Sequence, residues 1–300
     1  MEKTEGLSPQ QRALYLEKGY LVIEDFLTET EVVDLMEACS RIVDSIDPEE
    51  KAVRFSTVNQ VQRLVRKLEE KEGYFITSGD KIRHFFEEDA LDENGRLKVD
   101  KALSINKIGH ALHWLDPVFK KYTFSEKVKN FAKSLDYVRP MVVQSMYIFK
   151  QPTMGGYVIP HQDSSYLYTE PPTAMGFWLA LDDATLENGC LWFWPGSHLK
   201  FPEMKRRFVR YTDENGKVRV TYKGDEDNKV PESEWVPAPA KRGSCVLIHG
   251  GVYHKSEKNL SPKSRHAHTF HIIEGATSQW SPDNWLQPTD QVPFIPLYEN

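Results

Sequence analysis

The feature that most constrains the fold is a series of short β-prone segments that fills the chain from about residue 140 to residue 274. Turn sequences such as Glu187-Asn188-Gly189 and Trp194-Pro195-Gly196 separate these segments. The predicted strands are 141–150, 157–163, 176–182, 190–194, 245–249, 251–258 and 266–274. Many short strands at this spacing are typical of a barrel or a two-sheet sandwich. We therefore expect a mainly β fold with helical additions.

The first 139 residues carry helix signals instead. Ser8 before Pro9, and Thr28 with Glu31, are sequences typical of helix N-termini. The patterns predict helices at 9–18, 29–46, 48–75, 104–113 and 125–135, with strands at 20–27 and within 75–86. Because 300 residues can form one large domain, we expect a single domain. Its mostly helical part, 1–139, would pack on a β core at 140–300.

Residues 199–235 interrupt the β pattern. They are polar and charged and have no clear periodicity, so we interpret them as an insertion that carries a lid or a substrate loop. Lys205, Arg206, Arg207 and Arg210 lie within it and could bind an anionic group such as a phosphate. A solvated basic loop is the simpler interpretation of the same residues.

Composition argues against several other classes of protein. A net charge of -6 and a pI of about 6.0 give no general attraction to nucleic acid. The three cysteines are far apart, which predicts neither a disulfide framework nor a zinc knuckle. The polar N-terminus does not resemble a signal peptide, and no apolar run of about 18 residues could span a membrane. Since the C-terminus also lacks a peroxisomal Ser-Lys-Leu signal, we expect a cytoplasmic protein.

A possible metal site begins at His161-Gln162-Asp163. On a strand, His161 and Asp163 would point to the same face, because side chains alternate. A second histidine from a distant strand would complete two histidines and one carboxylate, the ligand set of non-haem Fe(II) oxygenases. The tripeptide alone is weak evidence, since His-x-Asp also occurs on polar surface strands.

Five histidines could supply the third ligand: His249, His254, His266, His268 and His271. If 251–258 and 263–271 form a hairpin, Ser256 faces Arg265 and His254 lies on the same face. This arrangement favours His254. It also places a guanidinium fork and a hydroxyl beside the metal, where they could bind the distal carboxylate of 2-oxoglutarate. The alternative is a surface hairpin with a salt-bridged arginine.

Longer segments carry a more specific signal than any single motif. They read SINKIGHALH at 104–113, VVQSMYIFKQP at 142–152, PHQDSSYLYTEP at 160–171, DATLENGCLWFWPGSH at 183–198, LIHGGVYHKS at 247–256 and NWLQPT at 284–289. In this order they resemble the phytanoyl-CoA dioxygenase family over nearly the whole chain from about residue 7. The insertion after His198 is the least similar part. The resemblance implies a double-stranded β-helix, or cupin-like jelly-roll, with helices packed against it.

The resemblance also implies a set of site residues. They are His161, Asp163 and His254 as ligands of Fe(II), Ser256 and Arg265 as ligands of 2-oxoglutarate, and Lys107, Met146 and Trp178 as further residues of the 2-oxoglutarate pocket. The implied reaction is hydroxylation by O2 of a small, lipid-like, acyl or anionic substrate, with release of succinate and CO2. Ascorbate is an optional reductant in such a reaction.

Other interpretations stay open for the whole chain and for single residues. The chain could be a 2-oxoglutarate and metal sensor, or a binding module with little turnover. It could also be a zinc hydrolase with the same three ligands. Met146 and Trp178 could be plain core residues, and Lys107 a solvated helix residue. His110 and His113 are expected to be packing or surface groups, and the sequence does not specify the oligomeric state.

Overall fold

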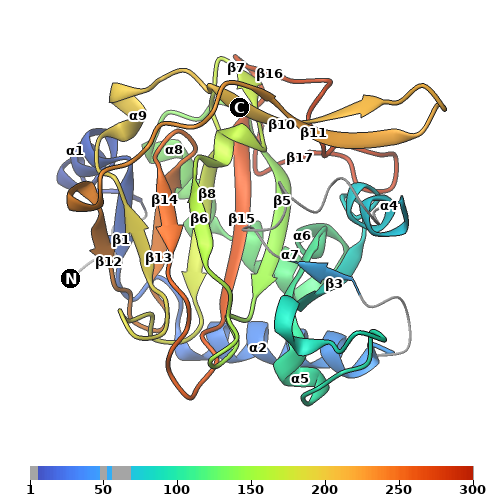
Figure 1. The fold of residues 1–300 in the computed structure, drawn as a ribbon. Helices are drawn as coiled ribbons and strands as arrows, with labels where there is room; N and C mark the ends of the chain where they lie inside the picture. Colours follow the sequence, from blue (N-terminus) through green and yellow to red (C-terminus); the bar gives the residue numbers. More distant parts are fainter. Residues whose placement is uncertain (1–5, 48–52, 56–68, 300) are drawn as a thin grey trace.

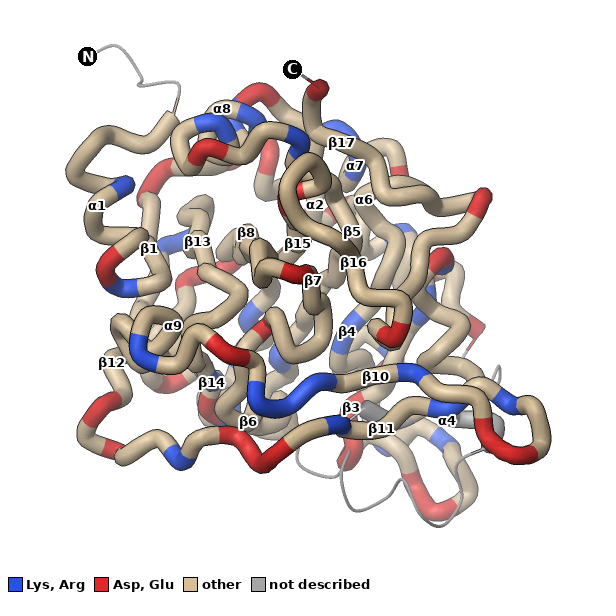
Figure 2. Tube along the Cα trace, turned by 90° about the horizontal axis from the view of Figure 1, so that it is seen from above, with Lys and Arg blue, Asp and Glu red and all other residues tan. Residues whose placement is uncertain are grey.

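Two β-sheets form the centre of the structure, a computed structural model that describes residues 6–47, 53–55 and 69–299. The larger sheet contains, in spatial order, β1 (Tyr20–Ile23), β13 (Cys245–His249), β8 (Met175–Ala180), β15 (Ala267–Glu274), β5 (Pro140–Ile148), β4 (Ile105–His110), β3 (Ile82–Glu87) and β2 (Arg54–Phe55), and β17 (Ile295–Pro296) pairs with β5. The smaller sheet contains β12 (Val236–Ala238), β9 (Leu191–Phe193), β14 (His254–Ser256) and β6 (Val158–His161). Figure 2 shows the smaller sheet along one side of the larger one.

Successive strands of the C-terminal half alternate between the two sheets. β5, β8, β13 and β15 lie in the larger sheet, whereas β6, β9 and β14 lie in the smaller one. Two short ladders, β10 (Arg206–Thr212) with β11 (Val218–Gly224) and β7 (Thr169–Glu170) with β16 (Gln279–Trp280), lie outside both sheets. A chain that crosses between facing antiparallel sheets in this way is a double-stranded β-helix, so the predicted fold class is confirmed.

The helices are α1 (Pro9–Lys18), α2 (Glu29–Ser45), α4 (Glu69–Ile76), α5 (Lys101–Ser104), α6 (Leu112–Leu115), α7 (Pro117–Thr123), α8 (Glu126–Ser134) and α9 (Ser197–Lys200), with short 3-10 turns at Glu88–Ala90, Asp163–Ser165 and Glu232–Glu234. Helices α2, α6, α7 and α8 lie on the outer face of the larger sheet, away from the smaller sheet, whereas α4 lies beside β11 (Figures 1 and 2). Ser8 is the N-cap of α1, and Thr28 with Glu31 forms the capping box of α2, as the sequence predicts. Apolar residues of α2, α7 and α8 share one core cluster with β4, β5, β8 and β15. None of the helices in the described ranges combines the length and apolar character that crossing a membrane requires.

The helix predicted at 104–113 is wrong, because residues Ile105–His110 form strand β4 between β3 and β5. Ile105, Ile108 and Leu112 recur at intervals of three and four residues, which imitates a helical period. The strand achieves the same spacing with a register shift opposite Phe85 and Phe86. This irregularity interrupts the alternation of side chains, so Ile105 and Ile108 both reach the outer core.

The predicted hairpin between 251–258 and 263–271 is also wrong. β14 pairs with β6 and β9 of the smaller sheet, whereas β15 pairs with β5 and β8 of the larger one. The turn residue Asn259 is buried and its side-chain amide donates to the carbonyls of Lys150 and Lys263. The turn therefore exists, but the chain crosses between sheets there. Pairing with distant strands prevails over the local hairpin.

Residues 199–235 contain more order than their sequence predicts. β10 and β11 form a regular antiparallel ladder from Arg206–Gly224 to Thr212–Val218, and Asn215-Gly216 lies in the connecting loop. An Asn-Gly pair between two β-prone runs is a strong hairpin signal that our reading of the sequence missed. Of the helix predicted at 48–75, residues 48–52 and 56–68 lie outside the described residues. Within the described part, Glu69–Ile76 form α4, but Arg54–Phe55 form strand β2, which pairs with β3, so the prediction is wrong there.

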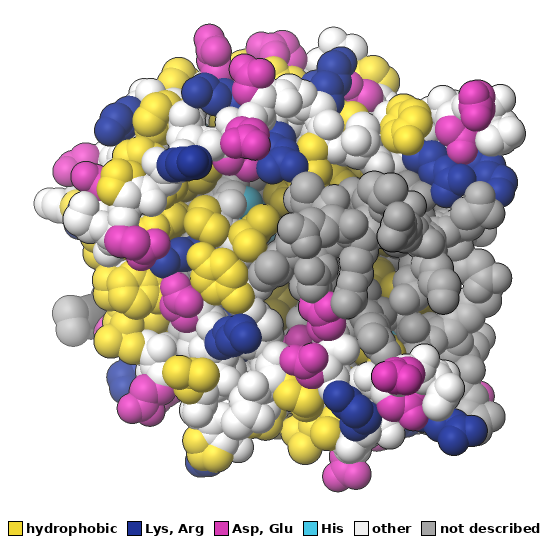
Figure 3. All heavy atoms as spheres, in the orientation of Figure 1, with side chains coloured by type: hydrophobic (Ala, Val, Ile, Leu, Met, Phe, Trp, Pro, Cys, Tyr) yellow, Lys and Arg dark blue, Asp and Glu magenta, His cyan; other side chains and the backbone are white. Residues whose placement is uncertain are grey.

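The face of the molecule shown in Figure 3 has no large patch of basic or of acidic side chains among the described residues. Basic and acidic side chains of described residues are mixed there with apolar ones. Ion pairs such as Arg139 with Glu299 and Arg242 with Glu29 are solvent-exposed. Pairs of this kind contribute little to stability. The stability of the fold must therefore come mainly from the apolar layer between the helices and the larger sheet.

We predict that Phe177→Ala lowers the free energy of unfolding by about 3–5 kcal/mol, because it leaves a cavity at the centre of that layer. Phe177 of β8 is fully buried and stacks on Phe270 of β15, with ring centroids 4.8 Å apart and planes 8° apart. Chemical denaturation measures the change. Leu199→Ala is the control, since Leu199 is 66% exposed, and should change stability by less than about 0.5 kcal/mol. Equal effects of the two substitutions would contradict this account of the core.

Candidate metal centre and its cavity

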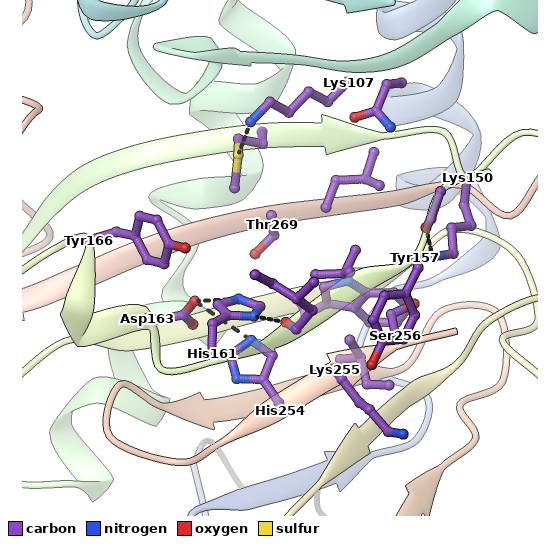
Figure 4. A pocket seen from close by; sticks show the side chains of 18 of the residues that line it. Lys107, Lys150, Tyr157, His161, Asp163, Tyr166, His254, Lys255, Ser256 and Thr269 are labelled. Atoms are coloured by element: carbon purple, nitrogen blue, oxygen red, sulfur yellow. Dashed lines mark hydrogen bonds and ion pairs between the residues drawn. The ribbon is translucent and has the colours of Figure 1, made fainter. Parts of the chain in front are cut away.

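A cavity of about 390 Å³ lies between the two sheets. Its walls come from β4, β5, β8 and β15 on one side and from β6 and β14 on the other. In Figure 4, His161, Asp163 and His254 point toward one another in this cavity, with Tyr166 on one side and Ser256 and Tyr157 on the other.

His161, Asp163 and His254 form the one metal-binding group found in the part of the chain that the structure describes. Their ligand atoms all lie within 4.8 Å of one another. His161 and His254 are direct partners across the β6–β14 ladder, which sets their imidazoles side by side with ring centroids 4.2 Å apart. Asp163 does not continue the strand as expected. β6 ends at His161, and Asp163 opens a 3-10 turn that aims its carboxylate at both rings.

Backbone carbonyls fix the tautomer of both histidines. Nδ1 of His161 lies 2.8 Å from the carbonyl of Ile159, and Nδ1 of His254 lies 3.1 Å from that of Val252. Because a carbonyl can only accept, each Nδ1 carries the proton. In its neutral form each ring therefore keeps a lone pair on Nε2, which lies 3.6 Å from Oδ1 of Asp163 in both cases. This is slightly wider than the spacing of about 3 Å between adjacent ligands that bind an ion at about 2.1 Å.

His271 holds the other oxygen of the carboxylate. Its Nε2 donates to Oδ2 of Asp163 at 3.2 Å, from strand β15 of the larger sheet. Gly176 makes this approach possible, since a Cβ there would lie 3.3 Å from His271 Nε2 and 3.5 Å from Asp163 Oδ2. The sequence offered His271 only as one candidate for the third ligand. In the structure it orients the carboxylate and leaves Oδ1 to face the two imidazoles.

Charge in this group is arranged to favour a cation. Burial alone would raise the pKa of Asp163, but His254, His271 and the hydrogen bond from His161 hold it well below its usual range. Burial, with the neighbouring His161, lowers the pKa of His254 to about 4, so this ring is neutral at pH 7. Burial acts in the same direction on His161, but the carboxylate outweighs it and raises the pKa of that ring.

A second feature of the cavity is a buried guanidinium. Arg265 is 2% exposed, and its Nε and Nη1 have no hydrogen-bond partner among the described residues. Nη2 lies 3.4 Å from the carbonyl of Gly189, which also accepts a hydrogen bond of 2.8 Å from the Ser256 hydroxyl. Burial lowers the pKa of Arg265 to about 10, so the group stays charged near pH 7. An unpaired buried cation is costly, and this one is suited to an anion that enters the cavity.

Comparison with known proteins assigns the chain. The family profile of phytanoyl-CoA dioxygenase matches residues 15–267. The chain belongs to the phytanoyl-CoA dioxygenase family. Phytanoyl-CoA dioxygenase domain-containing protein 1 of Bos taurus is 50% identical over 294 residues, which cover 97% of this chain and 99% of the relative. A phytanoyl-CoA dioxygenase of Arabidopsis thaliana is 44% identical over 284 residues, or 95% of each chain.

Solved structures support the same fold at much lower identity. The epimerase SnoN in complex with Fe3+, alpha ketoglutarate and nogalamycin RO has a TM-score of 0.62 at 16% identity, over 96% of this chain and 98% of that one. EctD from S. alaskensis with bound Fe has a TM-score of 0.56 at 19% identity, over 91% and 79% of the two chains. At these identities the similarity shows a shared fold alone.

The further residues that the family resemblance singled out also line the cavity. They are Lys107, Met146, Trp178, Ser256 and Arg265. Lys107 is a buried strand residue rather than a solvated helix residue, and its Nζ lies 4.0 Å from Sδ of Met146. Trp178 lies under Arg265, whose Cζ is 5.0 Å from the ring centroid. Although the predicted hairpin does not exist, Ser256 and Arg265 still meet at the carbonyl of Gly189.

The basic residues of the insertion have partners of their own. Arg206 lies 3.8 Å from Asp227, Arg207 pairs with Asp283, and Lys205 donates to Asn228 at 2.9 Å. None of these three side chains, nor that of Arg210, lines the cavity. The insertion contributes Phe208 instead, an apolar wall residue on β10. The basic run is thus neither part of the cavity nor a solvated loop, because most of it lies on strand β10 with Arg206 and Arg207 in ion pairs.

Metal affinity is expected to fall about tenfold for each pH unit below the pKa of His161, because binding must release one proton from that ring. The pKa of His161 lies above its ordinary value, whereas that of His254 is about 4 and adds no dependence near neutral pH. Calorimetric titration with Co(II) between about pH 6 and about pH 8 measures the slope. A hundredfold change per unit would mean that both rings are protonated, against the electrostatics described above.

Proposed function

We propose that the chain is an Fe(II)- and 2-oxoglutarate-dependent dioxygenase that hydroxylates a small molecule. The proposal depends chiefly on one juxtaposition, namely the presence of His161, Asp163 and His254 in the same cavity as the unpaired guanidinium of Arg265. Two histidines and one carboxylate suit a non-haem Fe(II) centre that keeps open positions. The family and the iron and alpha ketoglutarate in the names of the structural neighbours support the same assignment.

The donor set fits Fe(II), and the orphaned guanidinium fits a dicarboxylate. His161, Asp163 and His254 would hold the iron. Arg265 would bind the distal carboxylate of 2-oxoglutarate. Ser256 would join it by turning its hydroxyl proton from the Gly189 carbonyl to the carboxylate, since both side chains reach the same region of the cavity. When bound, iron and 2-oxoglutarate supply, with O2, the oxidising chemistry that adds oxygen to a carbon of the substrate and releases succinate and CO2.

The remaining residues of the site have clear physical tasks. Trp178 packs against the guanidinium, with Cζ of Arg265 5.0 Å from the ring centroid, and both side chains are buried. Lys107 and Met146 would complete the wall around the cosubstrate. Burial lowers the pKa of Lys107 to about 7, so a neighbouring anion would favour its charged form. His271 keeps the Asp163 carboxylate oriented while the other side chains bind or exclude ligands.

The deciding experiment measures succinate from 2-oxoglutarate with Fe(II) and O2, with and without an extract of small metabolites. The extract is then searched for compounds that gain the mass of one oxygen. We expect succinate with the wild type and none with His161→Ala, which removes a ligand of the triad. Tight binding of 2-oxoglutarate with no succinate under any condition would instead identify a sensor. Zinc in anaerobically purified protein, with no response to O2, would identify a hydrolase.

Arg265→Ala should raise the KM for 2-oxoglutarate by about 30-fold or more, since the variant loses charge-assisted hydrogen bonds in a buried site. Arg210→Ala is a matched control, because Arg210 lies on the insertion hairpin and does not line the cavity. It should leave the KM unchanged within about twofold. Succinate formation at varied 2-oxoglutarate measures both. A wild-type KM in Arg265→Ala would place the distal carboxylate elsewhere.

A further inference from the structure

The cavity includes an aromatic region that the proposed chemistry does not use. Phe75, His110, Tyr166, Phe208 and Trp285 line this region, which we call the aromatic chamber. Phe75 stacks on Trp285 with ring centroids 4.6 Å apart and meets Phe208 at 6.1 Å. Tyr166 lies 5.6 Å from Phe208 and 5.9 Å from the metal-ligand candidate His161. The chamber is therefore continuous with the metal centre.

His110 places one polar atom in this apolar wall. The residue is fully buried, and its Nδ1 lies 2.8 Å from the hydroxyl oxygen of Ser78. That hydroxyl donates its single proton to the carbonyl of Phe75 at 2.5 Å, so it can only accept from His110. Nδ1 thus carries the imidazole proton and Nε2 carries a lone pair. Burial, with the nearby charges of Lys107 and Arg83, lowers the pKa of His110 well below its usual range, which keeps the ring neutral.

This lone pair has no hydrogen-bond donor within the described residues. The rings around the imidazole are those of Phe75, Phe85 and Trp285, with centroids 5.7, 5.6 and 5.0 Å away. A buried acceptor without a partner carries the full cost of its lost hydration. A ligand that brings a donor to Nε2 would remove that cost. Because Lys107 and Arg83 are positive, a neutral donor suits the position better than a cationic one.

The sheet register relates His110 to the metal centre. His110 pairs with Ser145 of β5, and the neighbouring Gln144 pairs with His271 of β15, which holds Asp163. His110 therefore lies at the level of the metal group and two strands away, or about 10 Å across the sheet. A molecule the size of two fused rings, anchored at His110, would reach toward the iron ligands.

We propose that the aromatic chamber binds the substrate and that His110 selects it. The substrate would have an apolar or aromatic body and a neutral hydroxyl or N–H group that donates to Nε2 of His110. The identification of this ligand as a substrate rests on the proposed function. The selective binding itself needs neither iron nor 2-oxoglutarate.

Two probes that differ only in the donor test the proposal. 2-Naphthol carries a hydroxyl where 2-fluoronaphthalene carries a fluorine of similar size that cannot donate. Equilibrium dialysis against the metal-free full chain gives a dissociation constant for each probe. His110→Phe keeps an aromatic ring but removes the acceptor. We expect this variant to weaken the binding of 2-naphthol relative to that of 2-fluoronaphthalene by about tenfold. If that variant does not fold cooperatively, His110→Leu gives the same comparison.

Phe208→Leu is the matched control, because Phe208 lines the chamber but is not among the rings that pack against His110. It should weaken both probes alike and leave their ratio unchanged. The proposal is overturned if neither probe binds the wild type, or if replacing His110 does not change the ratio. Selective binding without succinate formation would leave the chamber intact and refute the dioxygenase. Succinate formation without selective binding would support the dioxygenase and refute the role of His110.

Discussion

The site depends on the cross-strand pairing of His161 and His254. Because these residues are direct partners in the smaller sheet, the ladder itself sets the distance between their rings. The third member, Asp163, is held from the opposite sheet by His271. The metal group therefore bridges the two sheets, and a slip of either strand by one residue would turn an imidazole away from the cavity. Packing of helices on the larger sheet supports this geometry from behind.

The sequence predicts helix starts and short motifs well where contacts between near neighbours in the chain determine the structure. Ser8 and Thr28 begin helices because their hydroxyls accept from the first turn, and nothing distant interferes. The spacing of two residues predicts that His161 and Asp163 point to one place, and the structure does bring them together. The carboxylate arrives by way of a 3-10 turn rather than a strand. The local geometry therefore differs from the one that the alternation of a strand predicts.

Apart from the β10–β11 hairpin, whose Asn215-Gly216 signal is local, the errors occur where partners distant in the sequence determine the structure. β4 imitates a helical spacing because of an irregularity in its pairing with β3, which appears only once that strand is in place. β14 and β15 are joined by a tight turn, yet each pairs with other strands. The role of His271 and the unpaired atom of His110 depend on Gly176 and Ser78, residues far from them in the sequence. No periodicity or motif could have revealed these contacts.

The buried guanidinium of Arg265 has a consequence for the folded state as a whole. An isolated cation in an apolar interior destabilises the native protein, and the unfolded chain, in which water surrounds the same group, carries no such penalty. Any anion that pairs with it binds the native form alone and shifts the folding equilibrium by mass action. The free energy of unfolding would then rise with the concentration of that anion.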